Sequence, residues 1–86
     1  MQFDGALIKE RGVSFAIVVV KPNVLDYSTE REQARQEFSR YFPGVPLVLM
    51  AQNSRGIPTY HGRQDIVNFL ANINPAAIPF KRYSVN

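Results

Sequence analysis

The sequence predicts one small α/β (α+β) domain in which two helices pack on a mixed sheet of four or five strands. Two pairs of segments rich in β-forming residues are each followed by an amphipathic helical pattern, which gives the order ββαββα. A chain of 86 residues has room for only one hydrophobic core. We therefore expect residues 1–86 to form a single two-layer domain, with an optional further strand near the C-terminal end.

The first pair of β-rich segments covers residues 6–10 and 13–20, which flank the dipeptide Arg11-Gly12. Glycine readily takes the positive φ that a tight turn needs, so the pair predicts a β-hairpin. The second segment ends in the apolar run from Phe15 to Val20. Such a run indicates a strand that is covered on both faces and is therefore central in its sheet. It is far shorter than the roughly 20 residues that span a bilayer, so we expect no membrane partner.

The first helix is expected over residues 29–41. Thr29 and Glu32 stand at the spacing of a capping box, in which each side chain satisfies a free backbone N–H at the helix start, and Pro43 follows the last turn. A narrow apolar stripe should face the sheet: Ala34, Phe38 and Tyr41. The opposite face carries charges of both signs and is predicted to be solvated surface: Glu30, Arg31, Glu32, Arg35, Gln36, Glu37 and Arg40.

The second pair of strands is expected at residues 47–51 and 57–61, on either side of a polar turn at 52–56. Pro58 has no N–H to donate, so the strand that contains it should lie at a sheet edge or bear a bulge. The last helix should cover residues 63–73. Its buried face is expected to consist of Ile66, Phe69, Leu70 and Ile73, with Val67 beside them.

The stretch from Val45 to Leu70 resembles the C-terminal half of thioredoxin-like domains. It contains a Val-Pro pair before a strand, a polar turn with glycine, a second strand, a further glycine and an amphipathic helix. The resemblance implies a thioredoxin-like scaffold, and it makes Pro46 a candidate for the cis proline that faces the redox site in that family. Because the chain has no cysteine, the resemblance does not extend to redox activity.

The residue inventory excludes several classes of chemistry. Without cysteine there is no disulfide, thiolate nucleophile, Cys-based zinc site or iron–sulfur centre. A single histidine and scattered carboxylates give no metal-ligand spacing, no serine has a nucleophile-elbow setting, and the glycines form no phosphate-cradling loop. We therefore expect no catalytic triad, no metal and no cofactor. The N-terminus lacks the pattern of a secretory signal, which favours a cytoplasmic location.

The net charge of +3 lies entirely in the second half of the chain. Residues 1–41 carry equal numbers of basic and acidic side chains, whereas residues 42–86 carry one acidic residue against four cations. These cations are Arg55, Arg63, Lys81 and Arg82. Such asymmetry is a mild indication of an anionic partner, although an excess of this size is also common in proteins that bind no polyanion.

His61 is the only histidine, and it is thus the only candidate for a general acid or base near neutral pH. It lies where the predicted edge strand meets the last helix, beside Tyr60 and near Arg63. The free N–H groups of that helix start could hold a phosphate or carboxylate together with Arg63. The alternative is structural: Gly62 serves the turn, His61 ends the strand, and Asp65 stabilises the first helical turn.

Two further segments are candidates for contact with a partner. The 52–56 turn offers several hydrogen-bonding side chains, but these are also favoured turn residues. The tail at 76–86 is expected to be an edge strand or an extended arm. Its Phe80-Lys81-Arg82-Tyr83 stretch has the composition that stacks on nucleobases and follows phosphates. Alternation along a strand would instead place Phe80 in the core and Lys81 in solvent.

By elimination, the leading hypothesis is a non-enzymatic binding or interaction domain whose partner is another protein or a second copy of the chain. Its contact surface would come from the 52–56 turn, the corner at 60–65 and the C-terminal tail. One rival is a nucleic-acid or phosphate-ligand binder, which requires the four cations of the second half to converge on one face. The other rival is a small enzyme that uses His61, which requires that residue to line a concave pocket.

Overall fold

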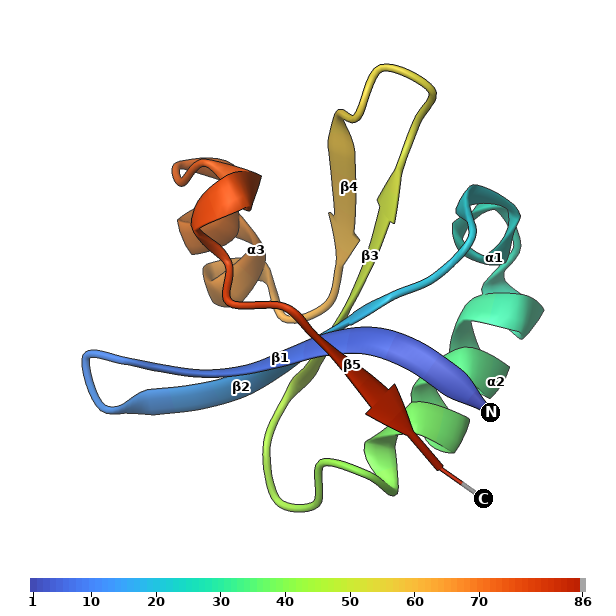
Figure 1. Cartoon of the computed structure of the whole chain (residues 1–86), viewed down its shortest axis with the longest axis horizontal. Helices are drawn as coiled ribbons and strands as arrows, with labels where there is room; N and C mark the ends of the chain where they lie inside the picture. The colour runs from blue at the N-terminus through green and yellow to red at the C-terminus, as the bar shows by residue number, and fades with distance from the viewer. Residues whose placement is uncertain (86) are drawn as a thin grey trace.

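The computed structural model describes residues 1–85 as a five-stranded mixed sheet with helices on both faces (Figure 1). The strands are β1 (Gln2–Glu10), β2 (Val13–Val19), β3 (Leu47–Gln52), β4 (Pro58–His61) and β5 (Lys81–Ser84). The helices are α1 (Pro22–Asp26), α2 (Ser28–Ser39), α3 (Gln64–Ala71) and the short 3₁₀ helix η1 (Pro75–Ala77). The order across the sheet is β4-β3-β2-β1-β5. The predicted α+β class and the order ββαββα are confirmed.

The predicted hairpin is formed by β1 and β2, which pair antiparallel from Gly5 opposite Val18 to Glu10 opposite Val13. Arg11 and Gly12 have φ of 50° and 82°. Two positive φ values in a two-residue connection define the turn type whose twist suits a hairpin, so the Arg11-Gly12 dipeptide explains the tight closure.

The predicted central strand is β2, which is the middle strand of the five. It runs parallel to β3, and the chain between them forms α1 and α2. Side chains of a strand alternate between the two faces, so a strand covered on both faces must be apolar at every position. Phe15 and Ile17 accordingly lie in one buried cluster, whereas Ala16 and Val18 lie in the other.

The sequence predicted two layers, with both helices on the sheet, but α2 and α3 cover opposite faces of the sheet (Figure 1). Ile66 and Leu70 of α3 pack in the same cluster as Phe15. Ala34 and Phe38 of α2 pack in the other cluster. The physical reason lies in β2 and β3, since both faces of these apolar strands must be shielded from water. The domain therefore has three layers.

The predicted capping box does not form. Pro22, at the first position of α1, starts a short helix that the sequence analysis missed, and α2 begins at Ser28 after the extended residue Tyr27. Thr29 consequently lies inside the first turn, and no side chain caps α2. The helix ends at Ser39, but the predicted stripe still faces the sheet, because Ala34, Phe38 and Tyr41 pack on the α2-side cluster.

The predicted C-terminal edge strand is confirmed as β5, which pairs antiparallel with residues 2–5 of β1. Phe80 packs on the α3-side cluster, and Tyr83 packs on the α2-side cluster, where its ring stacks on Phe3 at 5.1 Å between centroids. Asn86, the last residue of the predicted tail, lies outside the described residues. The aromatic residues of the tail are therefore used in packing.

The Val45–Pro46 bond is trans, like every other peptide bond in residues 1–85. The cis geometry that the thioredoxin-like resemblance implied for Pro46 is thus not present. Most X–Pro bonds in folded proteins are trans. The carbonyl of Pro46 accepts a hydrogen bond from the N–H of Ala16 at 2.9 Å, which aligns the start of β3 beside β2.

Candidate functional site

The six residues that the sequence analysis singled out do not come together in the fold. Arg55 lies in the β3–β4 loop before β4, whereas Arg63 follows the other end of that strand. Lys81 and Arg82 lie on β5, at the opposite edge of the five-stranded sheet. Tyr60 and His61 are neighbours on β4 but point to opposite faces, because side chains alternate along a strand.

Two of the four cations are held by carboxylates. Arg63 donates two hydrogen bonds to Asp65, at 2.7 and 2.9 Å, and this pairing lowers the pKa of the Asp65 carboxyl. Arg82 donates to Asp4 at 2.6 Å across the β1–β5 pair. The ammonium group of Lys81 lies 5.1 Å from the centre of the Tyr83 ring. These cations do not form one basic face.

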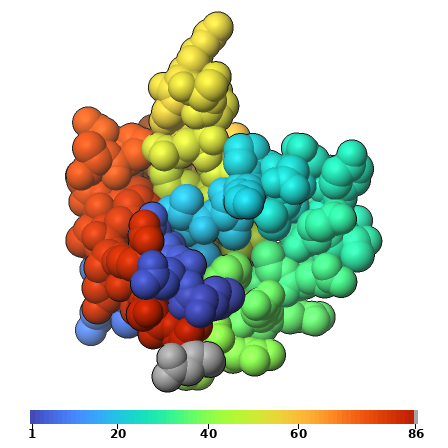
Figure 2. Space-filling view, turned by 45° about the vertical axis from the view of Figure 1, so that its right-hand side comes forward, coloured from blue at the N-terminus to red at the C-terminus, as the bar shows by residue number. Residues whose placement is uncertain are grey.

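The β3–β4 loop uses its polar side chains to hold its own shape. The Asn53 side-chain oxygen accepts hydrogen bonds from the N–H groups of Arg55 and Ile57, at 2.9 and 3.0 Å. The Gln52 amide donates to the carbonyl of Gly56 at 3.2 Å. Figure 2 shows this loop, in yellow, projecting beyond the rest of the surface. The structure thus supports the interpretation of these polar residues as turn formers.

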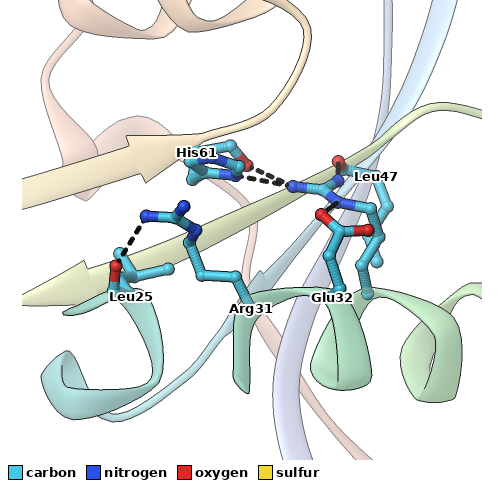
Figure 3. A network of polar contacts seen from close by, with 6 residues as sticks. Leu25, Arg31, Glu32, Leu47 and His61 are labelled. Atoms are coloured by element: carbon cyan, nitrogen blue, oxygen red, sulfur yellow. Dashed lines mark hydrogen bonds and ion pairs between the residues drawn. The ribbon is translucent and has the colours of Figure 1, made fainter. Parts of the chain in front are cut away.

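His61 is held by a network that reaches it from α2, on the side of the sheet away from α3 (Figure 3). The Arg35 guanidinium donates to His61 Nδ1 at 2.8 Å and to the His61 carbonyl at 3.1 Å. It also donates to the carbonyl of Leu47 at the start of β3. One planar group therefore joins a helix to the ends of two strands, a geometry that the fork of an arginine suits.

Arg31 and Glu32 complete this network (Figure 3). Arg31 donates to the carbonyl of Leu25, at the end of α1, at 3.0 Å. Glu32 lies 3.9 Å from Arg35, measured between its carboxylate oxygen and the guanidinium Nε. Both arginines are half-buried. The prediction that Arg31 and Arg35 belong to a solvated helix face is therefore wrong, because their guanidinium groups donate to backbone carbonyls of α1, β3 and β4.

The geometry fixes the protonation of His61. Arginine can only donate, so His61 Nδ1 must accept, and the ring proton lies on Nε2. Burial lowers the pKa of His61, and the charges of Arg31 and Arg35 lower it further, against a weaker opposite effect of Glu32. The histidine is therefore a neutral structural residue near pH 7, and it lines none of the larger surface grooves described below.

Stability should depend on pH through His61. Because its pKa is lower in the folded state, the unfolded chain binds more protons below the ordinary histidine pKa of about 6.5. The free energy of unfolding should thus be constant above that pH and fall as the pH drops toward 5. Urea unfolding at pH 7.5, 6.0 and 5.2 would measure this. In His61→Gln, whose amide oxygen can accept from Arg35, the fall should be smaller. An equal fall in both proteins would contradict the assignment.

Gly62 follows β4 at a point where the backbone lies very close to β3. A Cβ at this position would lie 3.0 Å from Val48 Cγ2 and 3.2 Å from the Leu47 carbonyl oxygen. Gly62 is therefore required by this close approach and not by the turn, because its φ is not in the positive range that favours glycine. We expect Gly62→Ala to lower the free energy of unfolding by about 1–2 kcal/mol, measured by urea unfolding. Gly56→Ala is the comparison that measures backbone strain without a steric clash. Gly56 has a φ of +77°, and a Cβ at this position would meet nothing within 4 Å.

Three open grooves on the surface of residues 1–85 are candidate sites. One, of about 530 Å³, lies between the start of β1 and α2, with Phe38 and Val20 among its lining residues and Glu30 and Glu37 on one side. A second, of about 440 Å³, lies near Gln52 and η1. The third, of about 410 Å³, is bordered by β1 and α3 and is called the edge groove here. It is lined by Leu7, Ile8, Lys9, Glu10, Phe69, Ile73, Ala77, Ile78 and Pro79.

The edge groove runs along the only part of β1 that lacks an outer neighbour among residues 1–85. Strand β5 pairs with residues 2–5 of β1, and no strand continues beside residues 6–10. Leu7, at 58% exposure, is the most exposed large apolar residue of the described strands. This edge was not predicted from the sequence, because the residue pattern does not show how far each strand extends.

Backbone alternation shows which groups this free edge offers. Met1 and Val85 exchange both of their backbone hydrogen bonds, at 2.8 and 2.9 Å. In an antiparallel pair, every second residue directs its N–H and C=O toward the same neighbour. Counting along β1 from Met1, the backbone groups of odd-numbered residues therefore point outward, away from β2. This agrees with the hairpin, in which the even-numbered Glu10 forms the closing pair with Val13 of β2. Leu7 and Lys9 therefore present free backbone donors and acceptors.

No protein-family model, curated protein or solved structure matches the chain. Within residues 1–85, no helix is long and apolar enough to cross a membrane. The same residues contain no group of three or more histidine, cysteine or acidic side chains placed to hold a metal ion. The candidate site is therefore defined by geometry alone, as the free edge of β1 and the edge groove.

Proposed function

We propose that the chain is a non-enzymatic protein-interaction domain that binds an extended segment along the free edge of β1. The observation that carries this proposal is the row of unpaired backbone groups at Leu7 and Lys9 beside an apolar groove. An extended segment placed there would continue the sheet, because its own N–H and C=O groups would pair with this edge. The backbone bonds would supply general affinity.

The edge groove would supply selectivity. Alternate side chains of a bound strand point to the same face. On the α3 side they would meet Phe69, Ile73 and Pro79, which line the groove together with Ile8. The preferred ligand is thus a segment with apolar residues at every second position. This mode of recognition combines a strand edge with a neighbouring helix, and it needs no charged or catalytic group.

The other edges of the sheet are less suited to such binding. Strand β4 has four residues and begins with Pro58, which has no N–H to donate. Strand β5 also has four residues and carries Lys81 and Arg82, and charged side chains discourage pairing at an edge. Residues 6–10 of β1 therefore offer the longest run with two outward-facing, unpaired positions.

The rival functions have less support. A nucleic-acid or phosphate-ligand binder needs its cations on one face, whereas Arg55, Arg63 and Arg82 lie at separate places and two of them pair with carboxylates. An enzyme that uses His61 needs a free ring nitrogen to accept a proton, whereas His61 Nδ1 accepts from Arg35. The interaction domain is accordingly the function we propose.

We further propose a thioredoxin-like scaffold without redox activity. Its support is the succession of β3, the antiparallel edge strand β4 and α3, which are the elements that the resemblance of residues 45–70 requires. The cysteine-free sequence is compatible with the reducing cytoplasm that we expect as the location of the domain.

Blocking the outward N–H of Lys9 tests the proposed function. Extended peptides selected from a displayed random library would be synthesised, and their affinity measured by calorimetry. Lys9→Pro removes one outward donor without removing a β1–β2 hydrogen bond, and Lys9→Ala retains the donor. We expect Lys9→Pro to weaken binding about tenfold or more, because a lost hydrogen bond leaves a peptide carbonyl unpaired. Lys9→Ala should change affinity by less than about threefold.

The position of the bound peptide provides the second readout. Backbone amide shifts in NMR spectra of the labelled domain should change most at residues 6–10 and at Phe69 and Ile73. Peptides that bind Lys9→Pro as tightly as the unmodified chain, or that shift residues on β4 or α2 instead, would contradict the proposal.

A further inference from the structure

We infer that the segment that binds the free edge of β1 is the same edge of a second copy of this chain, paired antiparallel about a two-fold axis at Ile8. This inference rests on the proposed function and names its partner. It is carried by the backbone register, by the cross-strand side-chain pairs that this register produces, and by the apolar surface that it covers.

The register follows from the outward-facing residues. Two antiparallel strands can exchange hydrogen bonds only where both direct their backbone groups toward each other, so odd-numbered residues must face odd-numbered residues. A two-fold axis at Ile8 places Leu7 opposite Lys9 of the second copy, and Lys9 opposite its Leu7. These two pairs would exchange four backbone hydrogen bonds. They would join two five-stranded sheets into one continuous sheet.

The side chains are compatible with this register. Ile8 meets its own copy at the axis, on the face where it packs on the α3-side cluster. The aliphatic stem of Lys9 lies over Leu7 of the other copy, which shields an apolar side chain that is 58% exposed in the single chain. Glu10 faces Ala6, so no two like charges stand directly opposite each other.

Neighbouring registers are less favourable. An axis at Lys9 places the two Lys9 ammonium groups opposite each other, and like charges directly opposite destabilise a strand pair. An axis at Leu7 brings Lys9 opposite Gly5, whose outward side is already paired with Lys81 of β5. The axis at Ile8 is therefore the register that both the free length of β1 and its charges favour.

The self-pairing is tested by charge substitutions at Leu7, whose exposure allows them without loss of the fold. Leu7→Lys places lysine opposite Lys9 twice in the dimer, whereas Leu7→Glu places glutamate there. The double variant Leu7→Lys, Lys9→Glu restores opposite charges in the same positions. Sedimentation equilibrium would measure the dimer dissociation constant of each protein, and circular dichroism would verify folding.

We expect the unmodified chain to form a dimer in a concentration-dependent manner and Leu7→Lys to raise the dissociation constant about tenfold. The double variant and Leu7→Glu should dimerise at least as tightly as the unmodified chain. A chain that remains monomeric at millimolar concentration, or equal weakening by Leu7→Lys and Leu7→Glu, would overturn the inference. If a selected peptide still binds such a monomer in a manner sensitive to Lys9→Pro, the proposed function stands and only self-pairing fails.

Discussion

Phe15→Ala is expected to lower the free energy of unfolding by about 3–5 kcal/mol. Phe15 is 2% exposed, and its ring lies edge-on to Phe69 of α3 at 6.3 Å between centroids. Truncation would remove the apolar contacts of a central strand and leave a cavity between the sheet and α3. Since domains are stable by only about 5–15 kcal/mol, this change should bring the chain close to unfolding.

Urea unfolding followed by circular dichroism would measure this effect. Val13→Ala, at the start of the same strand, is the matched control, because Val13 is 37% exposed. Its cost should stay below about 1 kcal/mol. A loss of less than about 1 kcal/mol in Phe15→Ala would show that the α3-side cluster is not the packed core described here.

Arg35→Met is expected to lower the free energy of unfolding by about 2–3 kcal/mol, because it leaves two backbone carbonyls without their charged donor. These carbonyls belong to Leu47 and His61, at the ends of adjacent strands. Methionine retains much of the apolar stem of arginine, so the loss of stability measures the contribution of the guanidinium group. Arg35→Lys should be almost as unstable, since a single ammonium cannot reach both carbonyls and the imidazole.

The control for this prediction is Arg40→Met, since Arg40 follows the last turn of α2 and is exposed. Its effect should remain within about 0.5 kcal/mol. The free energy of unfolding is again obtained from urea titrations at pH 7.5. Full stability in Arg35→Lys would mean that charge alone, and not the shape of the guanidinium, joins α2 to the strands.

Local patterns predicted the elements that depend on neighbouring residues. The Arg11-Gly12 dipeptide specified the hairpin, the apolar run from Phe15 specified the central strand, and Pro58 specified an edge strand. In each case the physical cause acts within a few residues: positive φ in the turn, apolar side chains on both faces, and a missing N–H donor.

Features that depend on distant parts of the chain were not predicted. Arg35 looks like one of several surface charges on α2, and only the fold brings it to Leu47 and His61. The same holds for the placement of α2 and α3 on opposite faces, since each has one apolar stripe that fits either side of the sheet. A signal for it was present in β2, where an unbroken apolar run requires cover on both faces.

The free edge of β1 could not be found from composition, because no unusual residue marks it. It results from a mismatch in length, since β1 has nine residues and β5 pairs with only four of them. Leu7, a large apolar residue that is 58% exposed, marks this edge only once the strand pairing is known. Charged motifs drew attention to Arg63 and Arg82 instead, and both prove to be paired with carboxylates.

Hydrogen exchange of individual backbone amides tests the central claim, the free edge of β1, most directly. The amides of Leu7 and Lys9 point outward, whereas that of Ile8 points to β2. Exchange at Leu7 and Lys9 should slow as the protein concentration rises, with Ile8 protected throughout, and Leu7→Lys should abolish the concentration dependence. Slow exchange at Leu7 and Lys9 in the dilute monomer, or rates that stay constant while the dimer forms, would contradict an open edge that pairs with a second chain.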